Sequence, residues 1–209
     1  MFRDEHGNIH ALNISKEFLI GAGVFGEVYR INENTCFKMF KSRSDIDIIE
    51  ANIKYIMDLQ QSGFDTSNIY EILNRIYVDD CFIGYTMKYY EDKDLFTFNR
   101  KYLFENYYRI QELFRELASH GIYFSDLHKN NMLLSNEGII LIDADFINMT
   151  FDTLEAYNRA MSLLNCAIRE LLFKYGTING YSKEDIQKLY IEFQYFKDNF
   201  DCDEPILIK

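Results

Sequence analysis

Proline is nearly absent from the sequence, and its scarcity removes one kind of architecture at the start. The 209 residues contain a single proline, Pro205, and no internal repeat or low-complexity tract. A proline-rich linker between separate modules is therefore excluded. A chain of this length suits one domain or two small lobes that share a cleft.

Cysteine is also sparse, and it follows no pattern. No two of the four cysteines (Cys36, Cys81, Cys166 and Cys202) are spaced as a CxxC pair, and the four histidines form no spaced metal motif with them. We therefore expect reduced, mostly structural cysteines, as in a cytoplasmic protein.

Long apolar runs and basic clusters are missing as well. No apolar run approaches the roughly 18 residues of a membrane span, and the N-terminal MFRDEHGNIH lacks the apolar core of a signal peptide. We expect a soluble cytoplasmic protein. The net charge is −11 and no cluster of Lys and Arg stands out. Nucleic acids and anionic membranes are therefore not expected as partners.

The sequence does contain ample material for a core, since 48% of its residues are hydrophobic and 16% are aromatic. In the first ninety residues, apolar patterns predict strands at 17–23, 26–32, 35–40, 69–78 and 81–90 and a helix at 44–61. The second half predicts helices at 105–120, 153–174 and 182–199 and a short strand at 139–142. Gly121 would end the first of these helices, and Ser182 would cap the last.

The stretch GAGVFGEVY at 21–29 has the G-x-G-x-x-G spacing. Glycines allow backbone N–H groups to approach phosphate oxygens closely, because no Cβ intervenes. A strand-like segment follows the third glycine, whereas a helix would follow in a dinucleotide fold. This context favours a glycine-rich lid over phosphates rather than an ordinary hairpin turn.

Lys38 lies in the apolar strand CFKMF and needs a partner, because burying an unpaired charge is costly. Glu50 on the following helix is the partner we expect, with Asp45 and Asp47 as alternatives.

Three polar residues follow apolar segments in the second half. Asp126 and Asn131 lie five residues apart in DLHKNN, and Asp143 follows the predicted strand at 139–142. Phosphoryl transfer to a hydroxyl needs a group that orients the hydroxyl and takes its proton, together with hard oxygen ligands for Mg²⁺. These three side chains could supply both.

Taken in order, these motifs resemble those of the protein-kinase-like superfamily. GAGVFGEVY resembles the glycine-rich loop, and Lys38 and Glu50 match the strand lysine and helix glutamate. The segments 124–131 and 141–146 resemble the catalytic loop and the metal-binding segment. The resemblance covers roughly residues 15–150 and is much weaker beyond them.

The resemblance implies an α+β, two-lobed protein-kinase-like fold. Residues 1–90 would form a five-stranded antiparallel N-lobe with one helix, and residues 91–209 a reduced, mostly helical C-lobe. Residues 87–91 would be the hinge, with ATP in the cleft between the lobes. Met87 would guard the back of the pocket, and backbone groups of the hinge would bind adenine.

The resemblance also implies a role for each site residue. Lys38 would hold the α- and β-phosphates while Glu50 orients it, and Asp126 would be the catalytic base. Asn131 and Asp143 would bind Mg²⁺, for which Mn²⁺ could substitute. The further contacts expected for ATP are Gly21, Ala22, Gly23, Val24, Phe25, Gly26, Val28, Met87, Lys88, Tyr89 and His128.

Several positions depart from the protein-kinase pattern. Phe124 and Ser125 stand where protein kinases have His-Arg, so control by a phosphorylated activation loop is not expected. His128 replaces a lysine, which makes the loop similar to that of aminoglycoside and other small-molecule phosphotransferases. Asp143 begins Asp-Ala-Asp instead of Asp-Phe-Gly, which leaves Asp145 as an alternative metal ligand. No Ala-Pro-Glu follows, and the activation segment is short.

The sequence therefore predicts a small, divergent kinase of bacterial or phage type. It would transfer the γ-phosphate of ATP to a hydroxyl group, with protein Ser/Thr, including its own, as the favoured acceptor and a small-molecule hydroxyl as the alternative. A nucleotide-binding pseudokinase is a further alternative, because the His-Arg pair is missing. AMP transfer is also open, although no residue selects it.

Overall fold

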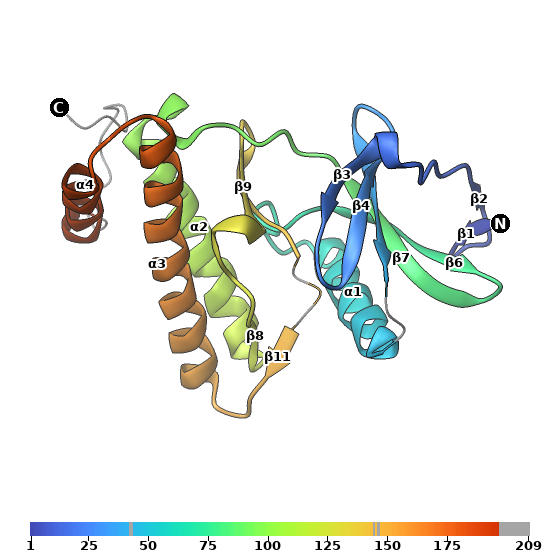
Figure 1. The fold of residues 1–209 in the computed structure, drawn as a ribbon. Coiled ribbons are helices and arrows are strands. Elements are labelled where there is room, and N and C mark those ends of the chain that lie inside the picture. Colours follow the sequence, from blue (N-terminus) through green and yellow to red (C-terminus); the bar gives the residue numbers. More distant parts are fainter. Residues whose placement is uncertain (42–43, 144, 146, 197–209) are drawn as a thin grey trace. The chain divides into compact units, whose positions relative to one another are not determined.

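The computed structural model describes residues 1–41, 44–143, 145 and 147–196. The chain divides into two compact units, which Figure 1 shows coloured along the sequence. Unit 1 contains Met1–Thr66 and Tyr70–Tyr90, and unit 2 contains Ser67–Ile69 and the chain from Glu91 onward. Within the described ranges, no helix is both long enough and apolar enough to cross a membrane.

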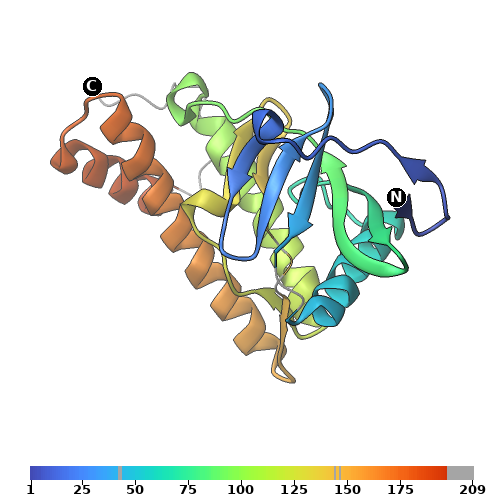
Figure 2. The ribbon, with the colours of Figure 1, turned by 45° about the vertical axis from the view of Figure 1, so that its right-hand side comes forward.

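Unit 1 is built on one antiparallel sheet with the strand order β2-β1-β6-β7-β5-β4-β3. The strands are β1 (Phe2–Asp4), β2 (Ile9–His10), β3 (Leu19–Ala22), β4 (Gly26–Arg30), β5 (Thr35–Phe40), β6 (Ile72–Val78) and β7 (Cys81–Lys88). A short 3₁₀ turn, η1 (Lys16–Phe18), precedes β3. Helix α1 (Ile46–Gln61) packs against β6 and β7, as the two views in Figures 1 and 2 show.

The sheet has seven strands where the sequence predicts five, and the additional strands are β1 and β2. β1 pairs with β6, with Arg3 opposite Tyr77, and also with β2. The buried carboxylate of Asp4 accepts hydrogen bonds from the backbone N–H groups of His6 and Asn8, and it contacts His10 Nε2 at 2.9 Å. Strands of two and three residues are too short to show an alternating pattern, so the sequence does not reveal them.

The apolar spacing of α1 determines which side of the helix is buried. Residues three and four apart lie on the same side of a helix, and here that side packs into the core. The buried residues of α1 are Ile49, Ile53, Ile56 and Met57. A separate cluster in the sheet contains Tyr29, Phe37 and Ile76, with Phe2 of β1 packed against it.

Unit 2 is mostly helical, with α2 (Arg100–Ser119), α3 (Thr153–Ile178) and α4 (Lys183–Phe196). α3 packs against both other helices, and its length is clear in Figure 2. Two antiparallel pairs join β9 (Met132–Ser135) to β10 (Gly138–Leu141) and β8 (Ile122–Phe124) to β11 (Ile147–Met149). Two 3₁₀ turns are η2 (Leu95–Thr97) and η3 (Lys129–Asn131).

Side-chain caps and a glycine fix the helix ends in unit 2. α2 begins before the predicted residue 105, because the Asn99 side chain accepts a hydrogen bond from the Tyr102 N–H at 2.9 Å. Gly121 follows α2 with a φ of +72°, and a Cβ there would lie 2.2 Å from the carbonyl oxygen of Thr150. Ser182 accepts from the Asp185 N–H at 3.1 Å, which confirms the predicted cap of α4.

A buried amide network holds Ser67–Ile69 in unit 2. Asn68 and Asn106 are each 3% exposed, and Asn68 Nδ2 donates to Asn106 Oδ1 at 3.0 Å and to the Ile139 carbonyl at 2.7 Å. Asn106 Oδ1 also accepts from the Ile139 N–H at 2.8 Å. This anchoring explains why β6 begins at Ile72 rather than at the predicted residue 69.

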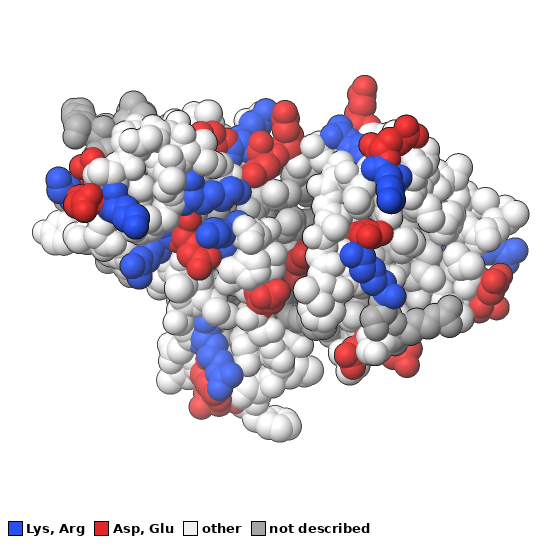
Figure 3. All heavy atoms as spheres, viewed as in Figure 1, with Lys and Arg blue, Asp and Glu red and all other residues white. Residues whose placement is uncertain are grey.

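Basic and acidic side chains are mixed over the face of the molecule that Figure 3 shows. Lys54 pairs with Asp58 on α1, and Arg159 pairs with Glu155 on α3. On the described residues of that face, no large patch carries one sign of charge.

Candidate functional site

The predicted phosphate-binding turn lies between β3 and β4 in unit 1. The Gly23 N–H donates to the Gly26 carbonyl at 2.9 Å, and the Lys41 ammonium donates to the Gly23 carbonyl at 3.2 Å. The side chain of Val24 is 86% exposed and that of Phe25 is 49% exposed. The turn is thus an exposed hairpin tip that is tied back to β5 through Lys41.

The glycines of this turn differ in what surrounds them. A Cβ on Gly26 would lie 2.7 Å from the Met39 carbonyl oxygen of the neighbouring strand, so packing alone requires glycine there. Among the described residues, a Cβ on Gly23 would meet no atom within 4 Å, and one on Gly21 would meet the Val28 side chain at ordinary contact distance. Packing of the described residues therefore requires glycine at position 26 but not at position 23.

Lys38 and Glu50 both belong to unit 1. Lys38 lies on β5 opposite Val28 and Tyr85 and is 5% exposed. The Glu50 carboxylate, on α1, accepts a hydrogen bond from the Tyr77 hydroxyl, and its Oε1 lies 3.2 Å from Arg75 Nη1. Burial and the hydrogen bond to Glu50 raise the pKa of Tyr77. The ion pair between Lys38 and Glu50 stays a prediction.

The end of β7 carries the predicted hinge. Met87 is 8% exposed and lies opposite Cys36 of β5. The Lys88 N–H donates to the Glu71 carbonyl at 2.9 Å, and the Tyr89 N–H donates to the Asn34 carbonyl at 2.8 Å. Both N–H groups are therefore already used within unit 1, so adenine would have to bind other backbone groups of this segment.

The predicted catalytic loop belongs to unit 2 and connects β8 to β9 through η3. Its two ends are fixed by the pairing of β8 with β11 and of β9 with β10. Within the loop, Asn131 Nδ2 donates to the Asp126 carbonyl at 2.7 Å and to Asp126 Oδ2 at 3.2 Å. Asn131 is 5% exposed, whereas the Asp126 side chain is 55% exposed. A buried amide thus holds an accessible carboxylate.

His128 lies on the same loop, close to Asp126. Its Nε2 is 3.5 Å from Asp126 Oδ1, and its Nδ1 accepts a hydrogen bond from the Asn130 N–H at 3.2 Å. The Lys129 N–H donates to Glu170 Oε2 of α3 at 3.2 Å. The loop is therefore fastened to the longest helix of the unit.

The predicted metal segment follows β10. The Ile142 N–H donates to the Asn131 carbonyl at 2.9 Å, which holds the segment against the catalytic loop. Asp143 has a φ of 57°, an uncommon value for a residue other than glycine, and is partly exposed. Asp145 is fully buried. Ala144 and Phe146 lie outside the described residues.

The donor set of this segment fits a hard cation. Amide and carboxylate oxygens are the ligands that Mg²⁺ prefers, and it commonly takes only one or two carboxylates and completes its shell with phosphates and water. Within the described residues, no group of three or more His, Cys, Asp or Glu side chains could hold a metal by itself. Asn131 with Asp143 or Asp145 would therefore hold Mg²⁺ together with a phosphate ligand, not as a closed protein site.

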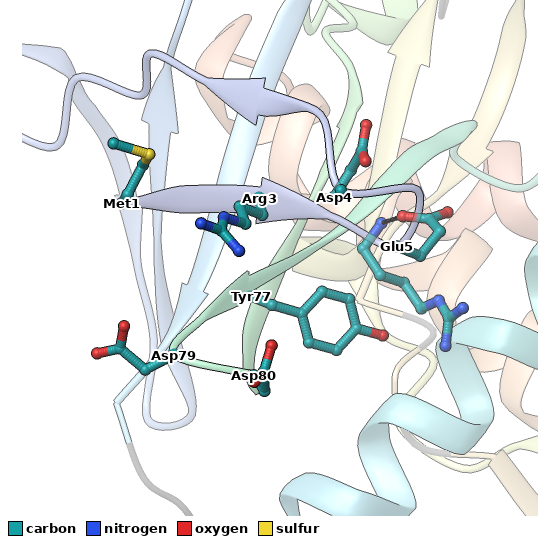
Figure 4. Close-up of a pocket in the computed structure, with 9 residues that line it drawn as sticks. Met1, Arg3, Asp4, Glu5, Tyr77, Asp79 and Asp80 are labelled. Carbon is teal, nitrogen blue, oxygen red and sulfur yellow. Dashed lines mark hydrogen bonds between the residues drawn. The ribbon is translucent and has the colours of Figure 1, made fainter.

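Figure 4 shows a pocket of about 660 Å³ in unit 1, formed by the N-terminal strand, β6 and the turn after it. Arg3, Arg75, Tyr77 and Asp79 are among the residues that line it, and none of the predicted site residues does. The Arg75 N–H donates to Glu5 Oε2 at 2.8 Å at one side of this pocket.

Sequence reasoning missed three residues that support the predicted site. Arg75 and Tyr77 hold Glu50, and Glu170 holds the backbone of the catalytic loop. Arg75 and Tyr77 both lie in the predicted strand 69–78, but nothing in the sequence links them to Glu50. Glu170 is 41 residues from its partner and lies on a helix with no motif of its own.

Comparison with known proteins finds similarity among solved structures but not among sequences. No protein-family model matches the chain, and no curated protein sequence matches it. Among solved structures, the crystal structure of the kinase domain of PF14_0431 matches with a TM-score of 0.54 and 14% sequence identity. The match covers 73% of this chain and 62% of that one, so the chain spans less than two thirds of the kinase domain. At this identity the likeness concerns the fold alone: the chain has a kinase-like fold.

Proposed function

We propose that the chain transfers the γ-phosphate of ATP to a hydroxyl group. One observation carries the proposal: the accessible carboxylate of Asp126 is held by Asn131, whose backbone carbonyl in turn holds the segment that leads to Asp143. The carboxylate of Asp126 and the amide of Asn131 lie on one loop, and the segment that leads to Asp143 is bonded to that loop, which supports a proton acceptor beside metal ligands, as phosphoryl transfer requires. The kinase-like fold is consistent with this chemistry.

In the proposed reaction, Asp126 orients the acceptor hydroxyl and takes its proton. The hydroxyl oxygen forms a bond to the γ-phosphorus while the bond from that phosphorus to the β,γ-bridging oxygen breaks, and ADP leaves with the electron pair. Asn131 and Asp143 would hold Mg²⁺, with Asp145 as the alternative carboxylate, and bound Mg²⁺ would neutralise charge on the phosphates. Lys38 and the turn around Gly23 would contact the phosphates of ATP.

We propose protein Ser/Thr, including residues of this chain, as the acceptor. The glycine-rich loop supports this choice because it resembles the protein-kinase version. The loop DLHKNN supports the alternative, a small-molecule hydroxyl. Phe124 and Ser125, which stand where protein kinases have His-Arg, support a second candidate function, a pseudokinase that binds nucleotide without turnover.

The test is incubation of the purified chain with γ-labelled ATP and Mg²⁺, beside Asp126→Asn and Asp143→Asn. Asp58→Asn is the matched control, because Asp58 is 57% exposed and pairs with Lys54 on the same helix. We expect label on the protein or on an added acceptor with the wild type and the control, and none with the two site variants. Stabilisation by Mg·ATP without any label or ATP hydrolysis would favour the pseudokinase. The absence of both would contradict the proposed function.

A further inference from the structure

The carboxylate of Asp126 is contacted at both of its oxygens by side chains of its own loop. Asn131 Nδ2 donates to Oδ2 at 3.2 Å, and His128 Nε2 lies 3.5 Å from Oδ1. The Asp126 side chain remains 55% exposed. Since each carboxylate oxygen has two lone pairs, these contacts still leave acceptor sites for a substrate hydroxyl.

The hydrogen bond at Nδ1 of His128 determines which ring nitrogen carries the proton. Nδ1 accepts a hydrogen bond from the Asn130 N–H at 3.2 Å, so Nδ1 carries no proton. In the neutral imidazole the proton is then on Nε2, the nitrogen that faces Asp126 Oδ1. His128 therefore presents an N–H to the carboxylate.

The backbone around His128 is fixed, which limits how far the ring can move. Asn130 N–H is held by the ring itself, and Lys129 N–H is held by Glu170 of α3 at 3.2 Å. His128 also caps η3, which ends at Asn131. The two residues that contact Asp126 thus extend from one anchored turn.

We propose that His128 is a positioning residue for Asp126. The sequence predicts instead that His128 contacts the nucleotide. Its Nε2–H faces one carboxylate oxygen while Asn131 donates to the other, and together these contacts favour one rotation of the carboxylate about its Cβ–Cγ bond. This role rests on the proposed function, because an oriented base matters only if Asp126 receives the hydroxyl proton. A small misplacement of a reacting group can cost a large factor in rate.

Two substitutions separate the contacts of His128. His128→Asn keeps an oxygen near the place of Nδ1, so the Asn130 N–H retains an acceptor, but it loses the Nε2–H. His128→Gln can place an N–H near Nε2 but loses the acceptor for Asn130. His120→Asn is the matched control, because the His120 side chain is 59% exposed and lies 3.6 Å from Glu116 in a similar contact outside the site.

We expect His128→Asn to lower kcat about tenfold, with the KM for ATP and the melting temperature unchanged. His128→Gln should recover part of kcat but melt at a lower temperature, and His120→Asn should match the wild type. A raised KM for ATP with unchanged kcat in His128→Asn would assign His128 to the nucleotide and overturn the proposal. Unchanged kcat and KM would reduce His128 to a cap of η3 and also overturn it.

A second measurement separates this proposal from the proposed function. Long-range ¹H–¹⁵N NMR of the full chain distinguishes protonated from unprotonated ring nitrogens, and the signal lost in His128→Asn identifies His128. We expect a proton on Nε2 that shifts in Asp126→Asn. A proton on Nδ1 would overturn the proposal even if the chain is an active kinase. If the wild type transfers no phosphate, the proposed function fails, while these spectra still decide the contact.

Discussion

Glu50 Oε1 and Arg75 Nη1 lie 3.2 Å apart, and the Tyr77 hydroxyl donates to the same oxygen. This arrangement ties α1 to β6, the strand that also pairs with the N-terminal β1. The second oxygen, Oε2, is the one that remains for the predicted ion pair with Lys38. Glu50 could therefore serve both as a structural link and as the partner of Lys38.

Removing the Tyr77 hydroxyl should lower the stability of unit 1. We expect Tyr77→Phe to lower the free energy of unfolding by about 1–2 kcal/mol at neutral pH, because a partly buried carboxylate loses a donor. The raised pKa of Tyr77 means that the native state keeps a proton that the unfolded chain releases near pH 10, so this advantage should shrink above that pH. Urea unfolding measures it, with Tyr190→Phe as the control. Equal losses in the two variants would contradict the assigned role.

Alanine substitutions of Gly23 and Gly26 should distinguish a glycine needed for ATP binding from a glycine needed for packing. Gly26→Ala should cost about 2 kcal/mol of stability, because its Cβ would lie 2.7 Å from a backbone oxygen that cannot easily move. Gly23→Ala should leave stability within about 0.5 kcal/mol of the wild type, and under the proposed function it should raise the KM for ATP. Thermal unfolding and steady-state kinetics on both variants test this. A strongly destabilised Gly23→Ala would show that the turn needs this glycine for folding.

The buried amide network should be among the most sensitive places in unit 2. Asn106→Ala leaves Asn68 Nδ2 and the Ile139 N–H without their shared acceptor, and we expect a loss of roughly 2–4 kcal/mol. The exposed Asn148 provides the control, and Asn148→Ala should change stability little. The measurement is equilibrium unfolding in urea. A loss below about 1 kcal/mol in Asn106→Ala would mean that water replaces the amide.

Asp4 should make unit 1 sensitive to acid. Burial alone would raise its pKa, but hydrogen bonds from His10, Asn8 and His6 outweigh burial and hold the pKa well below its ordinary value of 3.8. A lowered pKa stabilises the native state above the ordinary value, and this contribution is lost as the pH falls from about 5 toward the native pKa. At pH 7, Asp4→Asn should be less stable than the wild type by roughly 2 kcal/mol.

The pH dependence of that difference is the decisive observation for Asp4. As the pH falls below about 5, the wild type should lose stability faster than Asp4→Asn, so the two unfolding curves should converge. Comparing the two proteins at each pH cancels the contributions of the other carboxylates. If the difference in unfolding free energy stays constant from pH 7 to pH 3, the pKa of Asp4 is not lowered in the native state.

The sequence indicates those parts of the fold that repeat a pattern over many residues. The spacing of Ile49, Ile53 and Ile56 predicts α1 closely, and the short apolar segment CFKMF predicts β5 at Thr35–Phe40. The two N-terminal strands could not be predicted, because they depend on one buried carboxylate and a few cross-strand pairs. Ser67–Ile69 belong to unit 2 because Asn68 binds Asn106, which lies 38 residues further along the chain. No local sequence pattern predicts such a contact.

In the candidate site, too, the sequence predicts contacts within one loop but not contacts between distant elements. Asp126, Asn131 and His128 are close in the sequence, and the structure brings them into contact as a loop of that length should. The partners from other elements, Arg75 for Glu50 and Glu170 for Lys129, follow from the packing of helices against strands and loops. Motif spacing predicts the candidate site residues, whereas tertiary packing selects the residues that hold them.

The place of Ser67–Ile69 has a consequence for dissecting the protein. The backbone passes from one unit to the other at 66/67, 69/70 and 90/91, so a cut after Tyr90 does not yield two complete pieces. A fragment that starts at Glu91 would lack Asn68, leaving Asn106 and the Ile139 carbonyl without that partner. On the ribosome, these three residues emerge before the rest of their own unit exists. A graft or split version of unit 2 would have to supply them separately, as a short complementing peptide.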